Sequence, residues 1–351
     1  MNRRFSINPL RLTIDDLDHV FHSEDRGVLE DLAQAAQALT RQHFGRAISL
    51  YAPLYISNYC QNECAYCGFQ AASTGIARKK LTYEDIDREC RALAATGIRS
   101  CLILTGESRF HSPPSYIKEA ITIALRHFPN ITLEVYPLET EEYRGLYYAG
   151  ADGVTLYHET YDRNRYDELH LSGPKKNYGY RYQAPERIAR AGFRHISMGA
   201  LLGLSDWRED VPQFFRHIRY MEKRYPGVEY TLSFPRLRPV ANDDCRYFEV
   251  PDRDMVKIMC AGRLLFPRAG INLSTREDAC FRDRIIDFGV TKMSGGSLTT
   301  VGGYSDWQNT YEKGQFDVHD RRSVDEIKSM LINKGYDPVF TDWRNIANQN
   351  L

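Results

Sequence analysis

Short apolar, β-prone runs alternate with helical patterns along most of the chain, and this alternation restricts the possible folds more than any other feature. The runs predicted as strands are residues 46–56, 100–104, 131–136, 153–157, 195–199, 228–233 and 271–274, with a weaker eighth at 289–293. Helical patterns lie between them, such as the one that Thr82 caps and Gly97 ends, and the one that Pro114 opens. Eight strand–helix steps without a large break predict a (βα)8 barrel of the TIM type rather than an open doubly wound sheet.

Additional segments are predicted at both ends of this barrel. Residues 1–45 form a helical extension, residues 46–300 the barrel, and residues 301–351 a C-terminal extension packed on it. Ser323–Glu326 has the spacing of a capping box before a helix, and Trp343 is expected to pack outside the barrel.

Composition excludes several classes of protein. The 351 residues contain 46 Lys and Arg against 46 Asp and Glu, so no overall charge favours nucleic acid or an anionic membrane. No apolar run approaches membrane-spanning length, and the N-terminus lacks an apolar signal core. We therefore expect a cytoplasmic protein, in which the eight cysteines do not form a disulfide framework.

Three of the cysteines are bunched directly after the first predicted strand. Cys60, Cys64 and Cys67 have the spacing C-x3-C-x2-C. Thiolates are soft ligands for iron–sulfur clusters or zinc, and three of them leave one iron of a [4Fe–4S] cluster free for another ligand. A zinc site completed by a distant residue is the alternative, although loops after barrel strands form the usual active-site face. The remaining cysteines are predicted to be buried small hydrophobic residues: Cys90, Cys101, Cys245, Cys260 and Cys280.

This cysteine spacing, with an aromatic residue before the last cysteine, resembles the radical S-adenosylmethionine superfamily. The resemblance implies that Tyr66 lies against the adenine of S-adenosylmethionine. Thr105-Gly106-Glu107 is similar to the Gly-Gly-Glu element of that superfamily, which receives the methionyl amino group. Thr105 replaces the first glycine, and Gly106 and Glu107 keep the other two positions.

Longer stretches resemble one group within that superfamily, the aromatic amino acid lyases. These stretches are residues 54–60, 157–161, 199–204, 233–239 and 273–277. Residues 302–304, 319–322 and 342–343 look closest to the 2-iminoacetate synthase branch, which serves thiamine biosynthesis. The hydrogenase maturase branch carries a second, C-terminal cysteine-ligated cluster, and this chain has no cysteine after Cys280.

Residues at the ends of later strands are candidates for substrate binding. By resemblance Arg276 holds the substrate carboxylate, and a planar guanidinium suits this bidentate role; a surface ion pair is the alternative. Ser274 and Thr275 either donate hydrogen bonds to substrate or satisfy the backbone. Arg236 either lines the site or, with Arg238, braces neighbouring loops through carboxylates.

Two further residues are implied to contact S-adenosylmethionine. By resemblance Glu159, after the fourth strand, binds the ribose hydroxyls, and Arg181 meets the methionyl carboxylate; a solvated helix residue is the alternative for Arg181. Backbone amides of Ser294–Ser297 could face a polar ligand. His158 is predicted to be a packed strand-end histidine rather than a catalyst.

The resemblance implies a [4Fe–4S] cluster, S-adenosylmethionine and cleavage of the Cα–Cβ bond of L-tyrosine to 2-iminoacetate and p-cresol. It also implies flavodoxin or ferredoxin as reductant and thiazole synthase as a partner. Tryptophan as substrate, or tyrosine used for another product, remains an alternative, because the sequence indicates the amino-acid anchor better than the ring pocket. A zinc-stabilised binding module without catalysis is the alternative from another class.

Overall fold

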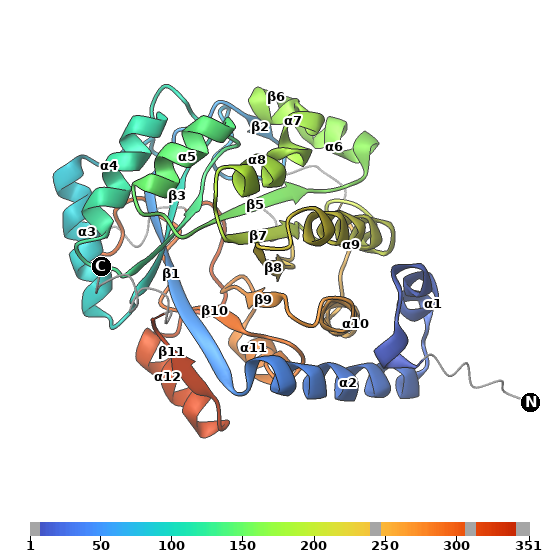
Figure 1. The fold of residues 1–351 in the computed structure, drawn as a ribbon. Coiled ribbons are helices and arrows are strands. Elements are labelled where there is room, and N and C mark those ends of the chain that lie inside the picture. The colour runs from blue at the N-terminus through green and yellow to red at the C-terminus, as the bar shows by residue number, and fades with distance from the viewer. Residues whose placement is uncertain (1–7, 239–246, 306–313, 342–351) are drawn as a thin grey trace, which may run out of the picture.

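The computed structural model describes residues 8–238, 247–305 and 314–341. Eight parallel strands form a closed ring, in which β10 pairs with β1. In ring order they are β1 (Ala47–Ser57), β3 (Ser100–Thr105), β4 (Asn130–Glu134), β5 (Gly153–Glu159), β7 (His195–Ala200), β8 (Glu229–Ser233), β9 (Gly270–Leu273) and β10 (Lys292–Ser294). The predicted (βα)8 barrel is therefore confirmed (Figure 1).

Helices on the outside of the ring connect successive strands. They are α3 (Tyr83–Ala95), α4 (Pro114–Ala124), α5 (Thr140–Tyr148), α8 (Ala184–Arg190), α9 (Trp207–Arg224), α10 (Asp252–Leu265) and α11 (Ala279–Ile285). The local signals act as predicted: Thr82 caps α3 in a capping box with Asp85, and Pro114 is the first residue of α4. The eighth strand begins later than predicted, because Gly289 adopts a positive φ of 114° and turns the chain before it.

Elements from both ends of the chain pack against this ring. The helices α1 (Leu17–His22) and α2 (Arg26–Phe44) precede β1, and α2 packs along α10 (Figure 1). After the barrel, Ser323 caps α12 (Val324–Asn333), and β11 (Asp337–Val339) pairs in parallel with the first residues of β1. Trp343 lies outside the described residues. No helix in the described ranges is long and apolar enough to cross a membrane.

The loops at the carboxyl ends of the strands contain short elements of their own. The cysteine loop includes β2 (Glu63–Cys64), which pairs antiparallel with β6 (His170–Ser172) from the segment after β5. That segment also contains α6 (Arg163–Leu169), a 3-10 turn at Pro174–Lys176, and α7 (Tyr178–Tyr182). Two loops far apart in sequence are thereby joined over one end of the barrel.

Candidate active site

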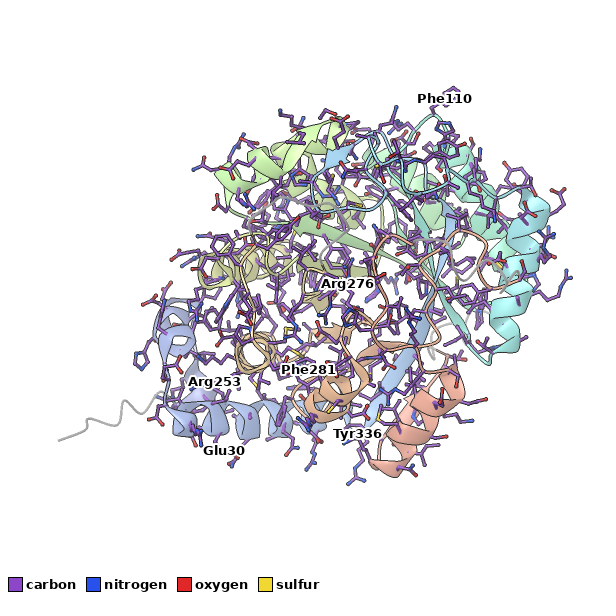
Figure 2. The ribbon with its side chains drawn as sticks, turned by 180° about the vertical axis from the view of Figure 1, so that it is seen from behind. Glu30, Phe110, Arg253, Arg276, Phe281 and Tyr336 are labelled. Atoms are coloured by element: carbon purple, nitrogen blue, oxygen red, sulfur yellow. The ribbon has the colours of Figure 1, made fainter. Side chains whose placement is uncertain are left out.

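A cavity of about 110 Å³ lies at the carboxyl ends of the barrel strands. Its walls include Tyr66 and Cys67 from the cysteine loop, Glu159 from β5 and Arg276 after β9. Figure 2 shows Arg276 near the middle of the molecule, far from the rim where Phe110 is exposed. Residues predicted separately from different parts of the sequence thus line a single space.

The cysteine loop holds three free thiols near one another. Cys64 is buried, while Cys60 and Cys67 are partly buried. Burial raises the pKa of the Cys64 thiol above its usual range, and the neighbouring Cys67 and Cys60 raise it further, whereas Lys175 lowers it. The backbone amide of Asn62 lies 3.5 Å from Cys60 Sγ. A thiolate here therefore needs a strong positive partner, which a metal centre provides.

The three thiols of the cysteine loop are the kind of ligand that an iron–sulfur cluster takes. Among the described residues, no three His, Cys, Asp or Glu side chains converge closely enough to hold one metal ion. A cubane cluster makes a different demand, because each cysteine binds a different iron at a separate corner. Cys60, Cys64 and Cys67, three free thiols of one short loop, provide three such ligands.

Gly106 and Glu107 lie against the cysteine loop. The Gly106 amide donates to the Ser57 carbonyl at 2.8 Å, and a Cβ on Gly106 would lie 2.3 Å from the Tyr59 carbonyl oxygen. Only glycine permits this close approach. Glu107 accepts a hydrogen bond from the Asn62 side chain at 2.7 Å, so its carboxylate is fixed beside the loop.

Glu159 has an unusual backbone conformation at the end of β5. Its φ of +79° is the only positive value for a non-glycine residue in the described ranges. Such a conformation costs about 1–3 kcal/mol and tends to persist at functional sites. The β5–β7 register also shifts between Tyr157 and Glu159. The strand thus ends in an irregularity at the residue that contributes its carboxylate to the cavity.

Two cations neutralise the Glu107 and Glu159 carboxylates. Arg181 donates to Glu107 at 2.7 Å and contacts Glu159 at 3.4 Å, while Lys175 Nζ lies 2.5 Å from Glu159 and 3.9 Å from Glu107. Burial raises the pKa of Glu107, but Arg181 and Lys175 outweigh it and hold that pKa below its ordinary value. Arg181 is buried on α7, so it is not the solvated helix residue considered as an alternative.

Tyr66 lines the cavity on the same side as Glu159 and Lys175. Its ring is buried, and its hydroxyl lies 2.7 Å from His170 Nε2. His170 Nδ1 in turn lies 2.7 Å from the Tyr166 carbonyl oxygen. This chain of contacts fixes the orientation of the Tyr66 ring.

Arg276 lies on the other side, with Ser274 and Thr275. Its guanidinium stacks 3.4 Å from the centre of the Phe316 ring. Thr275 is buried, and its amide bonds to the Ser294 hydroxyl at 3.0 Å. Within the described residues the guanidinium has no carboxylate partner, so the surface ion pair considered from sequence is not present.

Arg236 does not line the cavity. Its guanidinium binds Glu277 at 3.0 Å and Asp252 at 2.7 Å, and it packs over the Phe281 ring. Arg238 donates to the Arg276 carbonyl at 2.8 Å. Arg236 and Arg238 thus stabilise the loop that contains Arg276. For Arg236 this is the second of the two roles expected from the sequence, in place of contact with the substrate.

Sequence reasoning missed charged and aromatic residues that line the cavity, among them Lys175, Glu134 and Phe316. A polar residue at the end of a barrel strand indicates a site residue, and Glu134 is such a residue. It was missed because the predicted strand, residues 131–136, ends two residues beyond the observed one. His158 is buried among tyrosines and does not line the cavity. Cys280 is exposed at the start of α11, so the prediction that it is buried was wrong.

Known proteins resemble the chain over nearly its full length. A family model described as the radical SAM superfamily matches residues 54–218, and one described as the biotin and thiamin synthesis associated domain matches residues 233–337. The 2-iminoacetate synthases of Salmonella typhimurium (strain LT2) and Escherichia coli (strain K12) are each 40% identical to it, over 96% of this chain and 89% of the relative. The FeFe-hydrogenase maturase HydG from Carboxydothermus hydrogenoformans has a TM-score of 0.89 at 32% identity, over 95% of this chain and 77% of that one. The chain therefore belongs to the 2-iminoacetate synthase family of radical SAM proteins.

Proposed function

We propose that this protein cleaves the Cα–Cβ bond of L-tyrosine, giving 2-iminoacetate (dehydroglycine) and p-cresol for the thiazole of thiamine. The observation that carries the proposal is the 40% identity to 2-iminoacetate synthases over 96% of the chain. The cavity supports it chemically, because a guanidinium suited to a carboxylate lies in the same space as Cys67 and Glu159.

Membership of the radical SAM superfamily implies a [4Fe–4S] cluster and S-adenosylmethionine as cofactors. In this proposal Cys60, Cys64 and Cys67 hold the cluster, and its fourth iron is free for S-adenosylmethionine. When bound, these cofactors supply one-electron cleavage and hydrogen abstraction. Glu107 accepts hydrogen bonds from the methionyl amino group, and Glu159 accepts them from the ribose hydroxyls.

Other residues have their own parts in binding S-adenosylmethionine. Arg181 binds the methionyl carboxylate while it keeps Glu107 and Glu159 ionised. The Tyr66 ring, fixed by its hydroxyl, lies against the adenine. Gly106 keeps the cysteine loop close to Glu107 because no side chain fits there.

On the opposite side of the cavity, Arg276 binds the substrate carboxylate in a bidentate manner, and the Phe316 ring beneath its guanidinium fixes its plane. Ser274 adds a hydroxyl to this wall, and Thr275 supports it from a buried position. Leu102 and Leu104 keep part of the lining apolar, which limits access of water to the reacting bond.

The proposal extends to protein partners through the chemistry of the product. An imine such as 2-iminoacetate hydrolyses readily, so direct transfer to a thiazole synthase would protect it. A flavodoxin or ferredoxin would supply the electron for each turnover. Co-elution of the reconstituted protein with either partner would test this part separately.

The test of the activity is anaerobic reconstitution with iron and sulfide, then incubation with dithionite, S-adenosylmethionine and either tyrosine or tryptophan. Chromatography and mass spectrometry would follow 5′-deoxyadenosine, p-cresol and glyoxylate, the hydrolysis product of the imine. We expect p-cresol and glyoxylate only with tyrosine. Deoxyadenosine without p-cresol would move the substrate elsewhere, and a colourless zinc protein would refute the proposal altogether.

A further inference from the structure

Glu134 is a carboxylate residue of the active-site cavity to which the proposed function assigns no role. It is the last residue of β4 and lines the cavity together with Glu159 and Arg276. Thr132, two residues earlier on the same face of the strand, lines a smaller cavity in the barrel interior. In the part of the chain that the structure describes, the Glu134 carboxylate forms no hydrogen bond or ion pair.

Strand order places Glu134 across the barrel from Arg276. Around the ring of eight strands, β4 and β9 are four strands apart in either direction. The two neighbours of β4 are β3 and β5, which lead to Glu107 and Glu159. Glu134 therefore lies on the side of the cavity assigned to S-adenosylmethionine, and Arg276 lies opposite.

Several charged and titratable groups face Glu134. Burial raises its pKa to about 7; Glu159 also raises it, whereas Arg276, Lys175 and Arg181 lower it. The hydroxyls of Tyr51 and Tyr55 on β1 and of Tyr157 on β5 also lie within its field. A carboxyl group with a pKa near neutrality exchanges its proton readily under physiological conditions.

We propose that Glu134 binds the ammonium group of the substrate and accepts one of its protons. This inference rests on the proposed function. An amino acid held by its carboxylate on Arg276 is a zwitterion, and its ammonium group needs an anionic partner toward the cofactor side. Glu134 supplies that partner, and a partly buried carboxylate that faces the cavity without an ion-pair partner gains from such a cation.

The proton transfer is balanced within the cavity. An N–H bond of the ammonium group breaks, its electron pair stays on nitrogen, and an O–H bond forms on Glu134. The products are a neutral amine and a carboxylic acid, and no electron is gained or lost. The amine retains two N–H bonds, so loss of a hydrogen atom from nitrogen would give a neutral radical rather than a radical cation.

The test compares wild type, Glu134→Gln and Glu134→Asp as reconstituted holoenzymes with S-adenosylmethionine. We expect Glu134→Gln to keep the visible absorption of the cluster and to lose about 100-fold in kcat, since acid–base groups contribute about that much or more. The wild-type rate should fall as pH drops through about 7, where Glu134 becomes protonated before substrate binds. Glu134→Gln should lose this dependence, and Glu134→Asp should restore it in part.

Binding without reductant separates this role from a structural one. Glu134→Gln should bind L-tyrosine at least about tenfold more weakly, and bind 3-(4-hydroxyphenyl)propanoate, which lacks the amino group, as wild type does. An equal loss for both ligands would overturn the inference in favour of a contact to the phenol. An unchanged kcat and pH profile in Glu134→Gln would overturn it too, while p-cresol formation by wild type would leave the proposed function standing. Absence of p-cresol from wild type would instead refute the proposed function.

Discussion

The two sides of the cavity differ in how their charges are balanced. On the cofactor side, defined by the cysteine loop, Glu107, Glu159, Lys175 and Arg181, the Glu107 and Glu159 carboxylates each have a cation beside them, and Glu134 is the unpaired carboxylate on that side among the described residues. On the substrate side, defined by residues 274–276 and Phe316, the Arg276 guanidinium rests on an aromatic ring and has no carboxylate partner among the described residues. Ion pairs within the protein balance the charges of Glu107 and Glu159, whereas the charges of Arg276 and Glu134 are left for the substrate to neutralise.

The largest effect is expected from removing a cysteine of the cofactor side that would bind the cluster. Cys64→Ala should abolish the broad visible absorption of the reconstituted protein and all formation of 5′-deoxyadenosine, because it removes one of the three thiolates of the cysteine loop. Cys280→Ala is the matched control, since Cys280 is exposed, and it should leave both signals unchanged. Deoxyadenosine production by Cys64→Ala would show that this thiol is not a ligand.

The next effect concerns stability and depends on pH. Arg181→Met should lower the free energy of unfolding by about 3 kcal/mol at neutral pH, because it removes one cation from two buried carboxylates. The pKa values of Glu107 and Glu159 are held below their ordinary 4.5, so this stabilisation is present above about pH 4.5. It is lost as pH falls through the lowered values in the folded protein.

Thermal or denaturant unfolding from pH 7 to pH 3.5 would measure this difference. Arg190→Met is a suitable control, because its ion pair with Glu186 involves a largely exposed arginine and should contribute at most about 1 kcal/mol. If the difference in free energy of unfolding between wild type and Arg181→Met stayed the same as pH fell, the ion pairs of Arg181 with Glu107 and Glu159 would not be the source of the stabilisation.

On the substrate side, Arg276→Ala should reduce kcat/KM for tyrosine about 50-fold, the loss expected for a hydrogen-bonded charge pair. Cluster absorption and binding of S-adenosylmethionine should be unchanged, because neither depends on this residue. Arg253→Ala provides the control: Arg253 pairs with Glu24 at the N-terminal edge of the molecule, well away from Arg276 (Figure 2). Normal tyrosine kinetics in Arg276→Ala would remove the anchor from the proposal.

A smaller effect is expected when the support of Arg276 is weakened. Phe316→Ala removes the ring 3.4 Å from the guanidinium, and a cation–π contact of about 1 kcal/mol corresponds to about a fivefold rise in KM. Phe316→Tyr keeps the ring face and should behave as wild type. If Phe316→Ala left KM unchanged but lowered kcat, the ring would act on the reaction rather than on carboxylate binding.

The same contrast explains how much the sequence could predict. Cys60, Cys64 and Cys67 lie within one short loop, so their spacing alone indicated a metal centre, and alternation of patterns predicted the barrel. The role of Arg276 was predicted from the family resemblance, supported by its position just beyond a strand and by its guanidinium group. Each of these predictions depends on residues that are close together in the sequence, and sequence patterns record such short-range relations.

The remaining residues depend on tertiary structure. Lys175 belongs to a 3-10 turn without a recognisable motif, and it enters the cavity only because β6 pairs with β2. Phe316 lies after the last barrel strand and returns to the cavity through packing of Gly314 against Thr299. Arg236 follows a barrel strand and could have bound a substrate carboxylate, but its guanidinium pairs with Glu277 instead. None of these pairings has a fixed sequence spacing.

The central claim is that the carboxylate and ammonium groups of the substrate pair with Arg276 and Glu134, the two charged residues on opposite sides of the cavity that lack an ion-pair partner in the described part of the chain. The most direct measurement is a crystal structure of the anaerobically reconstituted protein with S-adenosylmethionine and L-tyrosine. We predict the tyrosine carboxylate on the Arg276 guanidinium, with the amino group directed toward Glu134 and the cofactor side. Tyrosine bound outside this cavity, or bound with its carboxylate away from Arg276, would contradict the account.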